Sequence, residues 1–145
     1  MRYSRPMLRS LASVLFSVFV GLTFAKFIEG GLSAVFSIPS ATAFPPERPM
    51  ISQSLAMVLA FSWSLAAFAS AMLALLLARR WAPLAWLSAA TIFFNSLIVM
   101  VGAIAPWFLW LFAIGGSVLG AYAAIYCLSA QYEMPSDKPK RDFNF

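Results

Sequence analysis

The chain has no histidine, and its single cysteine is Cys127. Histidine is the commonest metal ligand in proteins, a frequent axial ligand of haem and the usual pH switch near neutrality. A lone cysteine can form neither an internal disulfide nor a Cys-x-x-Cys redox pair. We therefore expect no metal site and no cofactor held by this chain.

Charged residues are also scarce, at 10% of the chain, and only 5 of its 145 residues are Asp or Glu. All of these acids except Glu29 lie between or after the long apolar runs, so paired carboxylates for proton transfer inside a membrane are absent. The sequence contains no Gly-rich phosphate loop, nucleophile elbow or zinc-binding helix motif. We therefore expect no catalytic residues and a protein that is not an enzyme.

Four long apolar runs fill the remaining sequence, at residues 8–28, 54–78, 83–105 and 107–128. The chain is 62% hydrophobic with a mean hydropathy of +0.85, well above a soluble domain. Each run can cross a hydrocarbon layer of about 30 Å as a helix. The sequence predicts an all-α integral membrane protein, a four-helix antiparallel bundle in residues 1–132. We expect spans at about 8–36, 53–78, 83–105 and 107–128, then a polar tail at 133–145 whose composition predicts disorder.

The net charge of +5 comes from basic residues near the ends of these runs. If all four runs cross the membrane, eight of them share one side: Arg2, Arg5, Arg9, Arg79, Arg80, Lys138, Lys140 and Arg141. Only Arg48 and Lys26 belong to the other side. Because Lys and Arg mark the cytoplasmic side, both termini should be cytoplasmic. The basic residues form no groove-sized patch, so we expect no nucleic-acid partner.

The first run has a second interpretation, as a secretory signal. Three arginines precede it, and Thr23-Phe24-Ala25 resembles a cleavage site. Threonine is a poor residue at the third position before a cut, so we favour a membrane span. Cleavage would leave the topology of the other three spans unchanged.

The end of the first run holds the clearest ionisable candidates, Lys26 and Glu29. Three residues apart, they share a helix face near the outer end of the span. Ionisable groups within a membrane indicate function by default, although a pair at the interface can simply neutralise itself. Beyond them, Gly30 and Gly31 leave two possibilities: the helix continues to about Phe36, or it breaks at the glycines.

Small residues recur at helical spacing in the second and fourth runs. The stripes are Ala56, Ala60 and Ser64; Ala66, Ser70, Ala74 and Ala78; and Gly116, Gly120 and Ala124. Small residues let helix backbones approach closely within a membrane. We favour packing within the bundle, with a homodimer or partner interface as the alternative.

The third run places Ser88, Thr91 and Asn95 on one predicted face, with Asn95 near the bilayer centre. An unpaired amide in hydrocarbon is costly, so we expect Asn95 to face another helix. It would form an interhelical hydrogen bond or, alternatively, line a site for a ligand or an ion. Trp63, deep in the second run, is expected to pack internally or to contact lipid or pigment. The other aromatics flank the turns, as in an aromatic belt.

Several positions together resemble a group of small, uncharacterised four-helix bacterial inner-membrane proteins. They are Gly21, Glu29, Phe36 and Pro39; Trp63, Leu65 and Ala67; the basic turn Arg79-Arg80; Asn95; and Pro106 with Trp107. The chain departs from the group at Leu32-Ser33, where the group has Gly-His, and in a longer gap between Asn95 and Pro106. The resemblance implies a bacterial inner-membrane location and no known activity.

Two functional hypotheses follow. The first is a non-catalytic accessory or scaffolding subunit of a larger membrane complex, such as an energy-transducing respiratory or photosynthetic one. Its partners would be membrane lipids and either another protein or a second copy, bound through small-residue helix faces. The alternative is a small oligomeric transporter or channel for a hydrophobic or cationic solute. Its path would use Lys26, Glu29, Thr91 and Asn95, and would need at least a dimer.

Overall fold

The computed structural model of the chain describes residues 4–36, 50–78 and 81–133. These contain four helices and no β-strand: α1 (Ser4–Val35), α2 (Gln53–Leu77), α3 (Ala82–Gly102) and α4 (Trp107–Cys127). All four are long and apolar enough to cross a membrane. The prediction of an all-α chain with four such helices is confirmed. The proline-rich segment 39–49, the Arg79-Arg80 turn and residues 134–145 of the tail lie outside the described residues.

Helix α1 is continuous through Gly30 and Gly31, so of the two alternatives the helix continues and does not break at the glycines. Each glycine weakens a helix by about 1 kcal/mol relative to alanine, which the long flanking segments outweigh. Ser52 caps α2 as expected for a serine at this position, and its hydroxyl accepts from the Leu55 backbone N–H at 3.3 Å. Pro83 lies in the first turn of α3, where a missing N–H costs nothing.

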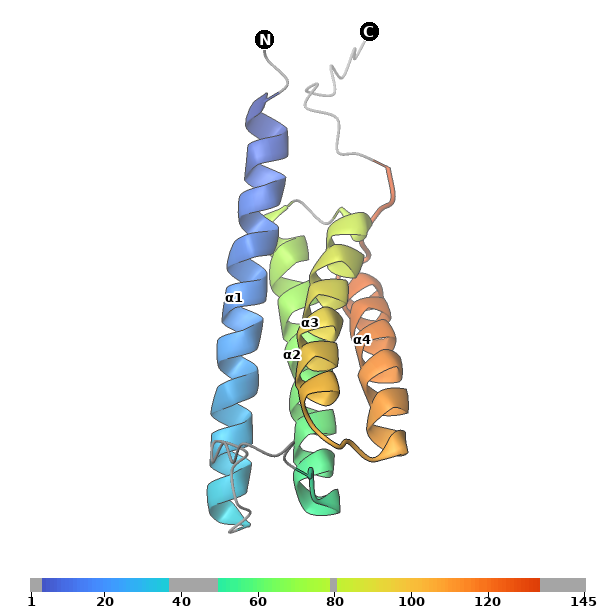
Figure 1. Cartoon of the computed structure of the whole chain (residues 1–145). Helices are drawn as coiled ribbons and strands as arrows, with labels where there is room; N and C mark the ends of the chain where they lie inside the picture. The colour runs from blue at the N-terminus through green and yellow to red at the C-terminus, as the bar shows by residue number, and fades with distance from the viewer. Residues whose placement is uncertain (1–3, 37–49, 79–80, 134–145) are drawn as a thin grey trace, which may run out of the picture.

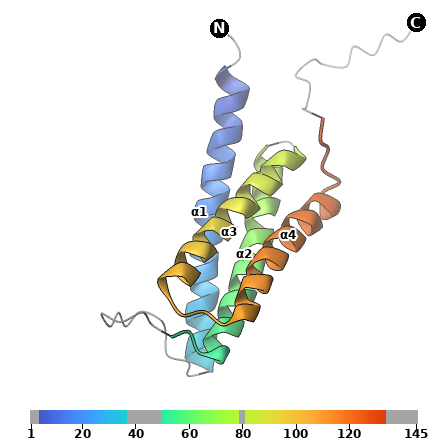
Figure 2. The same cartoon turned by 45° about the vertical axis from the view of Figure 1, so that its right-hand side comes forward.

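The helices alternate in direction, so the start of α1 and the end of α4 lie at the same end of the bundle (Figure 1). Helices α2 and α3 contact each other, and each also contacts α1 and α4. Helices α1 and α4 do not contact one another and lie on opposite sides of the α2–α3 pair (Figure 2). Consequently α1 and α4 each keep a free outer flank.

Backbone hydrogen bonds tie the connecting segments together at both ends of the bundle. At one end the Ile51 N–H donates to the Ile104 carbonyl at 3.1 Å. At the other end the Ala82 N–H donates to the Gln131 carbonyl at 2.8 Å. There the Trp86 indole N–H also donates to the Tyr132 hydroxyl at 3.2 Å. The segment after α4 is thereby held against the start of α3.

The interior is built mainly from small side chains, whereas many large apolar side chains lie outside. Ala56, Ala66, Ala67 and Ala71 of α2 are fully buried, and buried serines occur in all four helices. The buried serines that have a partner donate to backbone carbonyls of their own helix: Ser13, Ser17, Ser62, Ser88, Ser96 and Ser117. The helices are therefore joined by close packing of small residues.

Candidate functional site

Lys26 and Glu29 form an ion pair on α1, with 2.7 Å between Lys26 Nζ and Glu29 Oε2. The Glu29 side chain is only 12% exposed, whereas that of Lys26 is 73% exposed. The two charges neutralise each other, and the described residues contain no cluster of His, Cys, Asp or Glu that could hold a metal.

The buried seam of α3 runs through Ser88, Ile92 and Ser96, which are spaced four residues apart. Thr91 lies outside this seam; its side chain is exposed and donates to the Leu87 carbonyl at 2.9 Å. Asn95 is half-buried and makes no hydrogen bond with another described residue. Of the predicted polar face, only Ser88 is buried. The side of α3 that packs on neighbouring helices contains residues four apart, so it includes Ile92 and Ser96 in place of Thr91 and Asn95.

Trp63 is a core residue, 5% exposed, and packs in one cluster with Ala25 of α1 and Met100 of α3. Of the two expectations for this residue, the structure shows internal packing. Of the four residues of the predicted transport path, Lys26 and Glu29 pair on α1, whereas Thr91 is exposed and Asn95 is half-buried on α3. Because that path would need at least a dimer, it stays a prediction.

Gly116 and Gly120 bring α4 against α2. A Cβ at Gly116 would lie 2.8 Å from the Ser64 Cβ, and one at Gly120 would lie 2.9 Å from the Phe68 backbone nitrogen. Gly21 brings α1 against α2 in the same way, 2.8 Å from the Ser70 Cβ. These stripes are thus used for packing within the chain, as favoured from the sequence.

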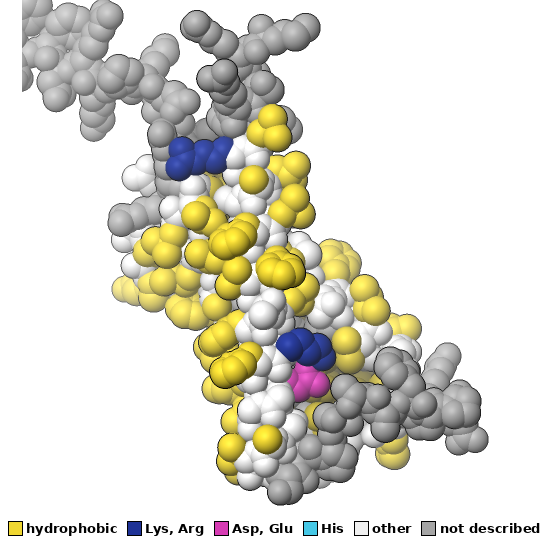
Figure 3. Space-filling model, turned by 90° about the vertical axis from the view of Figure 1, so that its left-hand side faces the viewer, with side chains coloured by type: hydrophobic (Ala, Val, Ile, Leu, Met, Phe, Trp, Pro, Cys, Tyr) yellow, Lys and Arg dark blue, Asp and Glu magenta, His cyan; other side chains and the backbone are white. Residues whose placement is uncertain are grey.

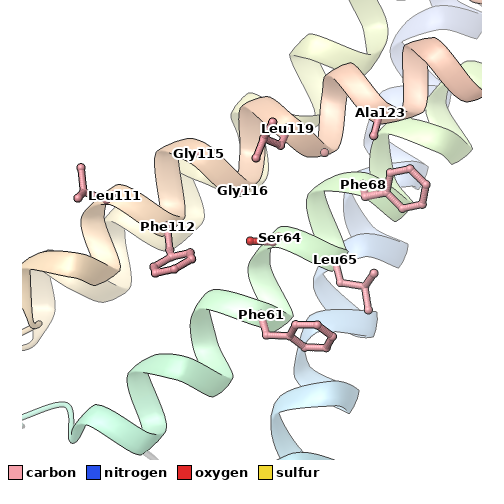
Figure 4. A pocket seen from close by; sticks show the side chains of 11 residues that line it. Phe61, Ser64, Leu65, Phe68, Leu111, Phe112, Gly115, Gly116, Leu119 and Ala123 are labelled. Carbon is pink, nitrogen blue, oxygen red and sulfur yellow. The ribbon is translucent and has the colours of Figure 1, made fainter.

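Beside this contact, α2 and α4 diverge to leave an outward-facing groove of about 650 Å³ (Figure 4). Ser64 points across it toward Gly116, and its hydroxyl donates to the Ala60 carbonyl at 2.7 Å. A Cβ at Gly115 would meet nothing within 4 Å, so this glycine leaves the groove open. The lining has no charged side chain: Phe61, Ser64, Leu65, Phe68, Leu111, Phe112, Gly115, Gly116, Leu119, Gly120 and Ala123.

A second hollow, of about 570 Å³, lies at the C-terminal end of α4. It is more polar and is lined by Tyr122, Ile125, Tyr126, Ser129, Ala130 and Tyr132. The Tyr122 and Tyr126 side chains are largely exposed, and Ser129 has a positive φ of 48° where the chain leaves the helix. These phenol and serine hydroxyls can donate hydrogen bonds to a polar group.

Sequence reasoning identified neither hollow. The doublet Gly115-Gly116 was the available signal, since one glycine faces α2 while its neighbour must face elsewhere on the helix. Together the two hollows can bind an apolar chain and a polar group, but they contain no nucleophile, acid and base arranged for catalysis. Comparison with known protein families, curated proteins and solved structures finds no match to this chain.

Proposed function

We propose that the chain is a multi-pass protein of the bacterial inner membrane with both termini in the cytoplasm. Four apolar helices with large hydrophobic residues on the outside suit a hydrocarbon surrounding, where such side chains need no burial. The even number of helices and the basic residues of the sequence support the orientation. Reporter fusions after Arg80 and at Phe145 should both give a cytoplasmic signal. An external signal at either position would refute this topology.

Within the membrane, we propose a non-catalytic role as an accessory subunit of a larger complex. The observation that carries this proposal is the free flank of α1. Leu8, Leu11, Leu15 and Phe19 are all more than half exposed and are spaced three or four residues apart. This spacing makes one continuous apolar stripe along the helix. Figure 3 shows that hydrophobic side chains dominate this flank.

Helix α1 is longer than the other three helices, and its extra length is the reason to assign the apolar stripe to a protein partner. Its 32 residues extend about 48 Å, against about 32 to 38 Å for the other helices. The excess lies at the N-terminal end, where α1 extends past its neighbours (Figure 1). Leu8 and Leu11 precede Val14, which packs at the end of α2 against Ala74 and Ala78. A hydrocarbon layer of about 30 Å reaches them only if the helix tilts. A helix of a partner membrane protein would cover them.

The test compares two triple variants after extraction in a mild detergent. Leu8, Leu11 and Leu15 change to alanine in one, and three equally exposed residues of α3 change to alanine in the control: Phe94, Ile98 and Val101. Native electrophoresis should show a larger species for the wild type and the control, and its loss in the α1 variant. Migration of the wild type as a lone monomer would refute the accessory role. An equal effect of both triples would refute the assignment of the interface to α1.

A further inference from the structure

The linings of the two hollows meet along α4, since the apolar groove extends to Ala123 and the polar hollow begins at Tyr122. Gly115 and Leu119 belong to the apolar groove, and Tyr122 and Tyr126 to the polar hollow. Their spacings of four, three and four residues place them on a single stripe of α4. We propose that this stripe is a binding site for one phospholipid, with an acyl chain in the groove and the glycerol–phosphate region at the tyrosines.

The apolar part has the depth of one membrane leaflet. Its α4 lining runs over residues 111–123, which is about 18 Å along a helix. Half of a hydrocarbon layer of about 30 Å is about 15 Å. An acyl chain about 15 Å long that enters at Ala123 therefore reaches residue 113, two residues beyond Gly115. This inference rests on the membrane insertion proposed above, and not on the protein partner of α1.

The groove has a volume of about 650 Å³, within the range of small-ligand sites in proteins. Phe61 of α2 and Phe112 of α4 line it on opposite sides. Its two glycines that face α2, Gly116 and Gly120, are already in contact with that helix. Gly115 and Ala123 remain as small residues that a second helix could approach on this side, so a second copy of the chain is the competing occupant.

The polar end has the chemistry of a membrane interface. Tyr122 and Tyr126 are 62% and 79% exposed, and their O–H groups can donate to phosphate or ester oxygens. The nearby Trp86 indole donates to the Tyr132 hydroxyl, which leaves the Tyr132 proton available as a further donor. Tyrosine and tryptophan are enriched at this depth in membrane proteins. The site thus matches a molecule that is apolar along one leaflet and polar at its end.

The experiment uses the full chain, purified in a mild detergent, with added palmitoyl-oleoyl phosphatidylglycerol and native mass spectrometry as the readout. The wild type should retain one phospholipid. Gly115→Leu fills the open groove without entering the α2–α4 contact and should lose it. Gly30→Leu is the matched control, because a Cβ there also meets nothing within 4 Å and α1 does not contact α4. Tyr126→Phe should weaken retention by about two- to tenfold, the effect of one hydrogen bond.

Gly115→Ala is a second variant for the case that Gly115→Leu fails to fold. Its single added methyl group should reduce phospholipid retention and leave the helical circular dichroism spectrum unchanged. Equal retention by the wild type and both Gly115 variants would overturn the site. Equal retention of the phospholipid by the wild type and Tyr126→Phe would overturn the role of this tyrosine. A dimer mass abolished by Gly115→Leu, with no lipid bound to the wild type, would show that a second copy occupies the groove.

Discussion

Gly120 of α4 provides the sharpest test of how the bundle is packed. A Cβ at this position would lie 2.9 Å from the Phe68 nitrogen, 3.3 Å from the Ala67 carbonyl carbon and 3.3 Å from the Phe68 Cα. All three atoms belong to the backbone of α2, so no side-chain rotation can make room. Gly120→Ala must therefore push α4 away from α2.

The expected cost follows from a comparison with Gly115→Ala on the same helix. Replacing glycine by alanine stabilises a helix by up to about 1 kcal/mol, and this gain is common to both variants. At Gly115 the added methyl group meets nothing within 4 Å, so no overpacking opposes the gain in helix stability. At Gly120 overpacking costs about 1 to 3 kcal/mol. We therefore expect the free energy of unfolding to be about 1 to 3 kcal/mol lower for Gly120→Ala than for Gly115→Ala.

The free energies can be measured by titrating each variant from a mild detergent into sodium dodecyl sulfate and following tryptophan fluorescence. Trp63 belongs to the same core cluster as Ala67 and Ala121, the sequence neighbours of this contact, and should report the loss of packing. Both proteins should be free of phospholipid, because Gly115 also lines the groove. If the two variants unfold within about 0.5 kcal/mol of each other, α2 and α4 are not in backbone contact and the packing described here is incorrect.

Substitutions at three further residues test their surroundings by the same titration. Gly21→Ala should destabilise the protein by about 1 to 3 kcal/mol relative to Gly30→Ala, because only Gly21 faces another helix closely; equal stability would contradict the α1–α2 contact. Ser70→Ala should stabilise it by about 1 kcal/mol, since the buried Ser70 hydroxyl has no partner among the described residues; destabilisation would reveal a missing partner. Asn95→Leu should change stability by about 1 kcal/mol or less, whereas Asn95→Asp should impair insertion; loss of a bound partner by a stably folded Asn95→Leu would instead assign Asn95 to function.

The number, type and approximate limits of the helices were predictable because they depend on local composition. Helix α2 was expected at about 53–78 and is observed at Gln53–Leu77, starting after the Ser52 cap. Helix α3 was expected at about 83–105 but ends at Gly102. There the chain turns early so that the Ile104 carbonyl can accept from Ile51 across the bundle. That hydrogen bond joins distant segments, so no local pattern could reveal it.

The sequence by itself determined that this chain forms four apolar helices and contains no recognisable catalytic or metal-binding motif, because length, hydropathy and residue type act locally. Only the tertiary structure decided which side of each helix is buried. On α3, Ser88 is buried whereas Thr91, three residues later, is exposed. Hydropathy could not predict this difference, because it barely distinguishes the sides of a helix that is apolar all round. Likewise, Gly115 and Gly116 are the same residue type, yet α2 packs on one and leaves a groove at the other.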